Sequence, residues 1–510
     1  MNIGIGHIVG IVAVLILIAA VGAWSGRKVS DASDFTTGGG RAGTAVVAGT
    51  IMGTLVSGQA TVGTAQLAFS YGLAAWWFTL GSGIGCLILG LAYAVRMRAT
   101  SSTTLVGAVV AEYGERIDFV ASIFSAVGIF ISVISQMISA SALITTLFPM
   151  PALAAALIAG TIMAVYVIFG GVWGAGIGGV VKLVLLYASC IVGAGVVLML
   201  AGGPAGVLGG VTTALAGTDL GALSGIAGAE DIPGRFLSLV ARGPFKDLGS
   251  GLSLVLGVIS TQSYASAIWA AKSDGAARKG ALLSAALIPP IGIACILIGL
   301  FMRGVCVTAD EAAALAAIGQ AVPEGVFVID STAQVFPQFV IHFLPQLAGG
   351  IALGAFFIAT VGGGSGLSLG VATVVVEDLL SHMVDRLRDP IFKLVVTRSL
   401  IVIVLVLAGA AALALPGSMI NDFGFLSMGL RGAVIFIPFT FALFAPGKIH
   451  SGWGLASVIM GPVAVIAGNL IGLPFDPLFL GVAVCLVIML VGLYAGGRTP
   501  ARTGAVRTRS

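Results

Sequence analysis

The sequence predicts an all-α, polytopic membrane protein with about thirteen transmembrane helices, and three observations support this fold class. The first is composition, because 58% of the 510 residues are hydrophobic and 9% are charged, whereas soluble domains carry about 25% charged residues. The second is length, because many apolar runs reach the roughly 20 residues needed to cross about 30 Å of hydrocarbon. The third is periodicity, because these runs are continuous rather than alternating, which favours helices over barrel strands.

The expected spans follow one another closely, except at two long loops, 202–247 and 303–341. They cover about 4–24, 44–70, 74–95, 119–148, 152–170, 178–201, 248–270, 280–302, 342–374, 394–416, 421–445, 452–472 and 476–496. We expect a single transmembrane domain over 1–510. It comprises an additional N-terminal helix at 4–24, a core at about 44–445, two C-terminal helices within 452–496 and a basic tail at 497–510.

The distribution of positive charge predicts the orientation of the chain. If the N-terminus is outside, 18 of the 24 Lys and Arg residues lie on the cytoplasmic side. Four lie on the opposite side, namely Arg235, Arg242, Lys246 and Arg303. Because Lys and Arg accumulate in cytoplasmic loops, this bias predicts a multi-pass protein of the cell membrane with its N-terminus outside and its C-terminus in the cytoplasm.

Two glycine-bearing polar interruptions occur inside expected spans. The second span contains "LVSGQATVG" at 55–63, and the seventh contains "GVISTQSYAS" at 257–266. Such interruptions at matching places in two halves indicate the binding site of a secondary transporter. The two interrupted spans begin five spans apart, which predicts a five-plus-five inverted repeat in which the first helix of each repeat is broken. The alternative is that small and amide residues only join neighbouring helices.

At the two breaks, hydroxyl and amide side chains are the candidate solute ligands. Ser57 and Gln59 belong to the first break, and Thr261 and Gln262 to the second. Unwound backbone in a membrane is tolerated only beside a water-filled cavity or within protein. We therefore expect these four side chains to contact a small polar organic solute.

Several stretches, in their order and spacing, resemble the sodium:solute symporter family across nearly the whole chain. They are "DFTTGGG" (34–40), "GTAQLAFSYGLAAWWF" (63–78), "FGG" (169–171), "STQSYASAIWAAKSDGAARKGALL" (260–283), "FPQFVIHFLP" (336–345) and "TVVVEDLL" (373–380). The resemblance implies a LeuT-type fold, alternating access and uptake of small organic solutes driven by sodium. It therefore identifies the expected domain as a transporter domain.

The resemblance also implies a cation site, from which this chain departs. With the register set on Glu377-Asp378, the two adjacent hydroxyl positions of the family fall at Gly362 and Gly363. The carbonyl positions fall near Gly53, Val56 and Ala359. A hard cation needs several oxygen ligands, so the sodium site is weakened. Coupling to a proton, or independence from sodium, is the alternative.

Lys182 lies inside the sixth expected span, where a charge costs about 2.5–3.5 kcal/mol at the helix centre. In some sodium-independent transporters of the LeuT fold, a lysine on the corresponding helix occupies the place of the cation. Lys182 is therefore a possible cation substitute that could carry a proton. The alternative is that Lys182 lies near the cytoplasmic end and extends its ammonium to the membrane surface.

Two further polar residues inside spans are candidate solute ligands. Gln136 lies beside Ser132, Ser135 and Ser139, and this polar stripe either lines the pathway or joins helices. Arg431, in the eleventh span, could bind a substrate carboxylate. Alternatively it could pair with Asp422, although nine residues of helix extend about 13 Å.

These patterns favour a secondary active symporter that works by alternating access and is coupled to sodium or to a proton. The alternatives are a transporter-fold sensor or regulatory subunit, and an ion channel, which would need a carbonyl filter or charged rings. An enzyme is not expected, because the spans lack clustered His, Asp or Glu. Neither a metal site, a cofactor nor a nucleic-acid partner is indicated, and the sequence does not indicate an oligomeric state.

Overall fold

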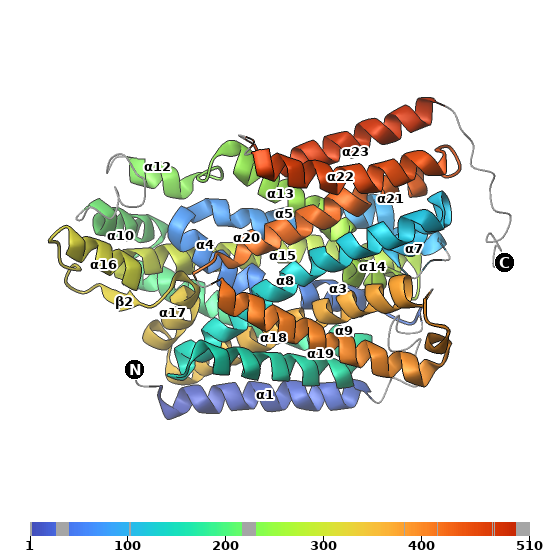
Figure 1. Cartoon of the computed structure of the whole chain (residues 1–510). Coiled ribbons are helices and arrows are strands. Elements are labelled where there is room, and N and C mark those ends of the chain that lie inside the picture. The colour runs from blue at the N-terminus through green and yellow to red at the C-terminus, as the bar shows by residue number, and fades with distance from the viewer. Residues whose placement is uncertain are drawn as a thin grey trace.

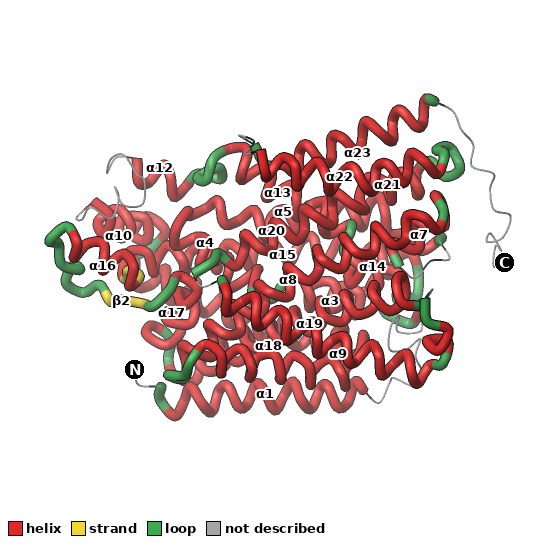
Figure 2. Tube along the Cα trace, viewed as in Figure 1, coloured by secondary structure: helices red, strands yellow, loops and turns green. Residues whose placement is uncertain are grey.

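The computed structural model describes residues 3–26, 40–216, 231–471, 473 and 475–495, except 101, 103, 382 and 416. Nearly all of this chain is helical, and the long helices run side by side along one direction (Figures 1 and 2). The predicted all-α class is confirmed. One addition to it is a short parallel pair of strands, β1 (Cys306–Thr308) and β2 (Phe327–Ile329). The predicted basic tail at 497–510 and residues 34–39 lie outside the described part.

In chain order, the helices are α1 (Ile5–Gly26), α3 (Thr44–Leu55), α4 (Thr64–Tyr71), α5 (Trp77–Ile88), α6 (Ala94–Ala99), α7 (Leu105–Tyr113), α8 (Asp118–Leu147), α9 (Ala152–Ala201), α10 (Pro204–Ala216), α12 (Asp231–Leu237), α13 (Pro244–Ile259), α14 (Gln262–Trp269), α15 (Asp274–Val305), α16 (Ala309–Ala317), α17 (Val335–Phe343), α18 (Gln346–Val374), α19 (Pro390–Ala414), α20 (Ile420–Arg431), α21 (Ile437–Phe444), α22 (Ser451–Ile471) and α23 (Pro477–Tyr494). Four π-helices extend or join them: η2 (Gln59–Gly63), η4 (Leu89–Tyr93), η7 (Val375–Leu380) and η9 (Gly432–Phe436).

Both predicted helix breaks are present. Helix α3 ends at Leu55, and residues 56–58 are irregular before η2 begins. Helices α13 and α14 meet at a bend of 41° across Ser260 and Thr261, where Thr261 is extended. Glycine and hydroxyl residues favour such interruptions, because they compete with helical hydrogen bonding or lower the cost of leaving the helix.

Membrane-spanning length is found in nine helices of the described chain, or ten if α13 and α14 form one span. Shorter apolar helices occupy the places of other expected spans, so the total of thirteen stays a prediction. Helix α9 is assigned as one helix where two spans are expected, and the side chains of 168–178 are not described. Tyr166 and Lys182, which lie on either side of that stretch, both approach Gly362 of α18.

The buried centre of the bundle is α18, which packs against α1, α3, α8 and α9. Small residues permit these close approaches. A Cβ at Gly10 of α1 would lie 2.6 Å from the Ile351 backbone nitrogen of α18. The two predicted long loops contain α10, α12, α16, α17 and the β1–β2 pair, which gather at one end of the bundle (left in Figure 1).

Candidate functional site

The first break is held by one glutamine of α8. The Gln136 side chain donates to Ser57 Oγ over 2.8 Å and accepts from the Gly58 backbone nitrogen over 3.1 Å. The neighbouring Gln59 donates its amide to Ser135 Oγ. All of these side chains are buried. An unwound backbone N–H thus finds its acceptor on α8, and the predicted residues Ser57, Gln59 and Gln136 come together.

Glycine is required at position 58 because the unwound segment lies close to both α8 and α18. A Cβ at position 58 would lie 2.2 Å from Ser139 Oγ, and 2.9 Å from Thr360 Oγ1 of α18. No side chain fits there without moving α8 or α18. The glycine therefore lets the unwound segment lie directly between these two helices.

The second break is held by Arg431, which is fully buried. Its guanidinium donates to Thr261 Oγ1 over 2.7 Å, to Ser427 Oγ over 2.8 Å and to Ser132 Oγ over 3.2 Å. A further bond runs from Arg431 Nε to the Ser427 carbonyl over 3.1 Å. Thr261 and Arg431 are therefore adjacent, as expected for two residues of one site.

Helix α8 connects the two breaks. Ser132 contacts the Arg431 group, while Ser135 and Gln136 contact the first break. Residues three and four apart share one helix face, so the predicted polar stripe of α8 faces both interruptions. Ser427, which lies one turn before Arg431, was not predicted, and its i, i+4 relation to that arginine is the only signal in the sequence.

Gln262 lies apart from both groups. Its side chain accepts from the Leu105 backbone nitrogen over 2.9 Å and donates to Ser266 Oγ over 3.1 Å. It therefore caps the first turn of α7. Its predicted place among the solute ligands is not supported by these contacts.

Two buried hydroxyls at the breaks have no hydrogen-bond partner in the described chain. They are Ser139 Oγ, beside the first break, and Ser260 Oγ, within the second. Both side chains are at least 97% buried. Buried polar groups are nearly always bonded, so each break carries unused hydrogen-bonding capacity.

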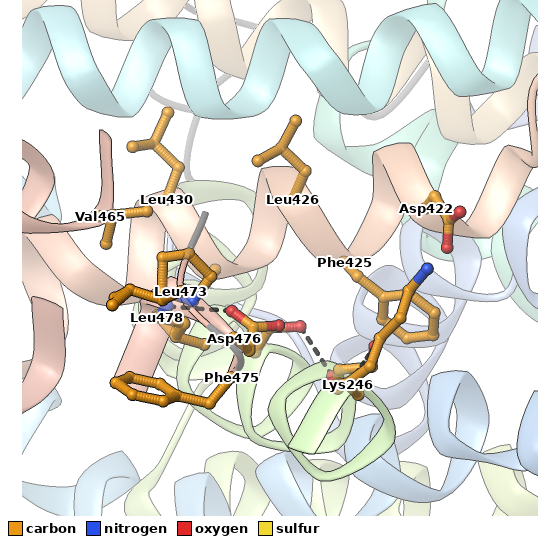
Figure 3. Close-up of a pocket in the computed structure, with 14 residues that line it drawn as sticks. Lys246, Asp422, Phe425, Leu426, Leu430, Val465, Leu473, Phe475, Asp476 and Leu478 are labelled. Carbon is orange, nitrogen blue, oxygen red and sulfur yellow. Dashed lines mark hydrogen bonds between the residues drawn. The ribbon is translucent and has the colours of Figure 1, made fainter. Parts of the chain in front are cut away.

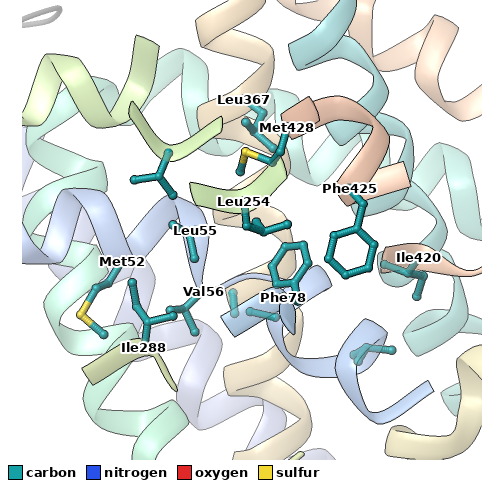
Figure 4. Close-up of a cluster of buried hydrophobic side chains, with 14 of the residues drawn as sticks. Met52, Leu55, Val56, Phe78, Leu254, Ile288, Leu367, Ile420, Phe425 and Met428 are labelled. Atoms are coloured by element: carbon teal, nitrogen blue, oxygen red, sulfur yellow. The ribbon is translucent and has the colours of Figure 1, made fainter. Parts of the chain in front are cut away.

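A cluster of buried apolar side chains includes Leu55 and Val56 at the first break (Figure 4). The rings of Phe78 and Phe425 lie 5.8 Å apart, and Leu55, Val56 and Met428 are nearby in the same view. All five side chains are buried. A few polar groups set in apolar walls are typical of small-molecule sites.

The Lys182 ammonium contacts two of the three carbonyls at which the resemblance places the cation. It donates to the Gly53 carbonyl and, over 3.5 Å, to the Ala359 carbonyl. The side chain is 2% exposed, so the alternative in which it extends to the membrane surface is wrong. The predicted carbonyl of Val56 has no bond to this ammonium.

One of the two glycines at the lost hydroxyl positions, Gly363, has a steric explanation. A Cβ at Gly363 would lie 2.4 Å from Ser57 Cβ, and one at Gly362 would lie 3.4 Å from Lys182 Nζ. A side chain at 363 would therefore displace the first break. A Cβ at 362 would be in ordinary van der Waals contact with the ammonium, so packing does not by itself require glycine there.

A separate cavity of about 480 Å³ opens at the end of the bundle between α13, α20 and the start of α23 (Figure 3). Asp422 lines it and pairs with Arg242 over 2.9 Å. The predicted alternative of an Asp422–Arg431 pair is therefore wrong. Asp476, at its edge, caps α23 by accepting from the Leu478 backbone nitrogen over 2.9 Å.

Comparison with known families decides which transporter class this site belongs to. Residues 35–461 match the model of the Sodium:solute symporter family. The chain belongs to this family. It is accordingly a secondary active symporter with a LeuT-type fold, and nothing found supports a channel or a sensor.

Two solved structures illustrate the fold of this family member. A Na⁺-coupled sialic acid symporter in its substrate-bound outward-open state is 16% identical, with a TM-score of 0.73, covering 98% of this chain and 99% of that one. Mhp1, a transporter of the nucleobase-cation-symport-1 family in a closed conformation, is 13% identical, with a TM-score of 0.56, covering 92% and 98%. No curated protein matches in the sequence search.

Proposed function

We propose that this symporter binds a small polar organic solute between its two helix breaks and moves it by alternating access. Ser57, Gln59, Gln136, Thr261 and Arg431 are its ligands. The observation that carries this proposal is that both breaks contact the same polar face of α8. The unpaired hydroxyls at each break supply hydrogen bonds that a solute can complete.

The coupling cation follows from the position of Lys182. In the site that the family resemblance assigns to sodium, an ammonium already bonds the carbonyls of α3 and α18. A tethered amine changes its charge only by exchanging a proton, and buried lysines release protons readily. The moving cation of this symporter is accordingly a proton. Protonated Lys182 ties the first break to α18, and the neutral amine lacks that charge-assisted bond.

Ion-dependent uptake in proteoliposomes tests the proposal. An inward proton gradient should drive saturable solute uptake without sodium, and Lys182→Gln should abolish the response to the gradient. Arg303→Gln is the matched control, since Arg303 is also a buried cation but pairs with Glu311 in the 303–341 segment. Uptake by wild type that strictly requires sodium refutes the role of Lys182.

The orientation of the chain is part of the same proposal. The end that carries α16 and the β1–β2 pair faces outside, and the end that carries α7 faces the cytoplasm, as the charge bias predicts. In intact cells, an impermeant maleimide should label Glu324→Cys in the α16–β2 segment but not Lys448→Cys between α21 and α22. The opposite labelling pattern would reverse the orientation.

A further inference from the structure

We propose that the transported solute is a carboxylate and that Arg431 binds its anionic group. This inference rests on the proposed function and adds the chemical class of the solute. It depends on three features of the described residues: the charge balance of the core, the position of the guanidinium and the donors around it.

Among the described residues, the charge balance leaves Arg431 without a carboxylate partner. The charged side chains that are buried in the described chain are Asp118, Lys182, Asp247, Arg303, Asp378 and Arg431. Arg242 pairs with Asp247, and Glu311 pairs with Arg303. Arg431 forms its bonds with hydroxyl and carbonyl oxygens, and no described carboxylate forms an ion pair with it. A buried charge is costly unless an opposite charge compensates it.

The guanidinium lies beside a second positively charged feature, the N-terminus of α14. Gly128 of α8 makes room for the stem of Arg431, because a Cβ there would lie 2.7 Å from Arg431 Cγ. The stem thereby reaches Thr261, the residue that precedes the first turn of α14. The first turn of a helix has free N–H groups and a partial positive charge. The guanidinium and this helix terminus therefore favour an anion at the same place.

The residue before Thr261 carries a further unused hydroxyl. Ser260, next to Thr261, has a buried hydroxyl without a partner in the described chain. A carboxylate has two oxygens that accept about four hydrogen bonds. It can take the bonds from the guanidinium that now go to neutral hydroxyls. Charge-assisted bonds of this kind are about twice as strong as neutral ones.

If Arg431 has only a structural role, a different result is expected. If the guanidinium only joined α8, α14 and α20, its hydrogen bonds would suffice, and the protein would not distinguish a carboxylate from an amide of the same shape. Acetate and acetamide differ in charge but hardly in size, and either small molecule fits a site built for a larger carboxylate. Their comparison therefore isolates the charge.

The experiment measures the thermal stability of the purified full-length wild-type protein against acetate or acetamide, at constant ionic strength. Acetate should raise Tm in a saturable way and acetamide should not, because a ligand that binds the folded state stabilises it. Arg431→Gln should remove the effect. Arg431→Lys should raise the half-saturating acetate concentration about tenfold or more, because lysine lacks the forked geometry. Arg303→Gln should keep the wild-type response.

Each other outcome overturns the assignment. Equal stabilisation by acetate and acetamide, stabilisation by neither, or an acetate effect that persists in Arg431→Gln excludes a carboxylate subsite at Arg431. The wild-type comparison holds even if Arg431→Gln does not fold. Proton-driven uptake of a neutral solute would remove the anion assignment and leave the symporter intact. Acetate binding without uptake of any carboxylate would instead remove the proposed transport function.

Discussion

Replacing Gln136 by methionine tests the hydrogen bonds that hold the first break. The substitution keeps the length of the side chain and removes its amide. The Gly58 backbone nitrogen then loses its acceptor, whereas the Ser57 hydroxyl keeps a contact of 3.4 Å with the Leu55 carbonyl. The main loss is therefore one buried peptide N–H without a partner.

The expected magnitude follows from these two bonds. A buried donor that loses its partner costs about 1–3 kcal/mol, and an interhelical side-chain bond in a membrane contributes on average about 0.6 kcal/mol. Gln136→Met should therefore destabilise the folded protein by about 1.5–3.5 kcal/mol in the absence of solute. Solute uptake should also weaken, because the first break loses its support.

The assay is thermal unfolding of the purified variant, followed by uptake in proteoliposomes at several solute concentrations. Ser139→Ala is the matched control for stability, because it removes a buried hydroxyl of the same helix that has no partner in the described chain. Its Tm without solute should stay close to that of wild type. If Gln136→Met unfolds at the wild-type temperature and transports normally, the assigned support of the first break is incorrect.

Two other predictions concern a packing contact and a titrating group. Gly58→Ala places a Cβ 2.2 Å from Ser139 Oγ. The substitution should lower the free energy of unfolding by about 1–3 kcal/mol, and Ser139→Ala should restore part of this loss. Gly43→Ala is the control and should cost less, because a Cβ at position 43 meets no atom within 4 Å. Burial raises the pKa of Glu112 above its ordinary value of 4.5, and the Gly447 backbone bond opposes the rise. The contribution of this carboxyl to stability is present below pH 4.5 and is lost as pH rises through the raised pKa. Tm profiles should show a smaller loss above pH 4.5 in Glu112→Gln than in wild type, and parallel profiles would contradict this assignment.

The membrane fold was predictable because composition and run length suffice to identify spans. The two breaks were also predictable, since glycine, hydroxyl and amide residues interrupt otherwise apolar runs. The short strands and the helices of the 303–341 segment were not, because their apolar runs are too short to stand out from a loop.

The sequence predicted only some of the site residues correctly, because it does not show in which direction each side chain points. Gln59 and Gln262 occupy similar positions in the two interrupted segments, yet only Gln59 contacts α8. Rotation of a helix about its axis depends on packing against distant segments, which spacing along the chain does not report. Asp422 shows the same limit, because its partner Arg242 lies 180 residues away in the chain.

The depth of Lys182 was the feature that the sequence left most open. The same sequence pattern is expected whether the ammonium extends to the cytoplasmic surface or points to the centre of the bundle. Gly179 resolves the difference in the structure, because a Cβ there would lie 2.3 Å from the Gly49 carbonyl. This close approach of α9 to α3 brings Lys182 within reach of the Gly53 carbonyl.

The central claim is that Lys182 fills the position that sodium takes in this family. Its most direct test is the thermal stability of the purified wild-type protein in sodium chloride against choline chloride at equal ionic strength. The same Tm in both salts at every concentration is the predicted result, because the carbonyls of Gly53 and Ala359 already bind the ammonium. A saturable rise of Tm with sodium in wild type, at concentrations where choline has no effect, would contradict the claim.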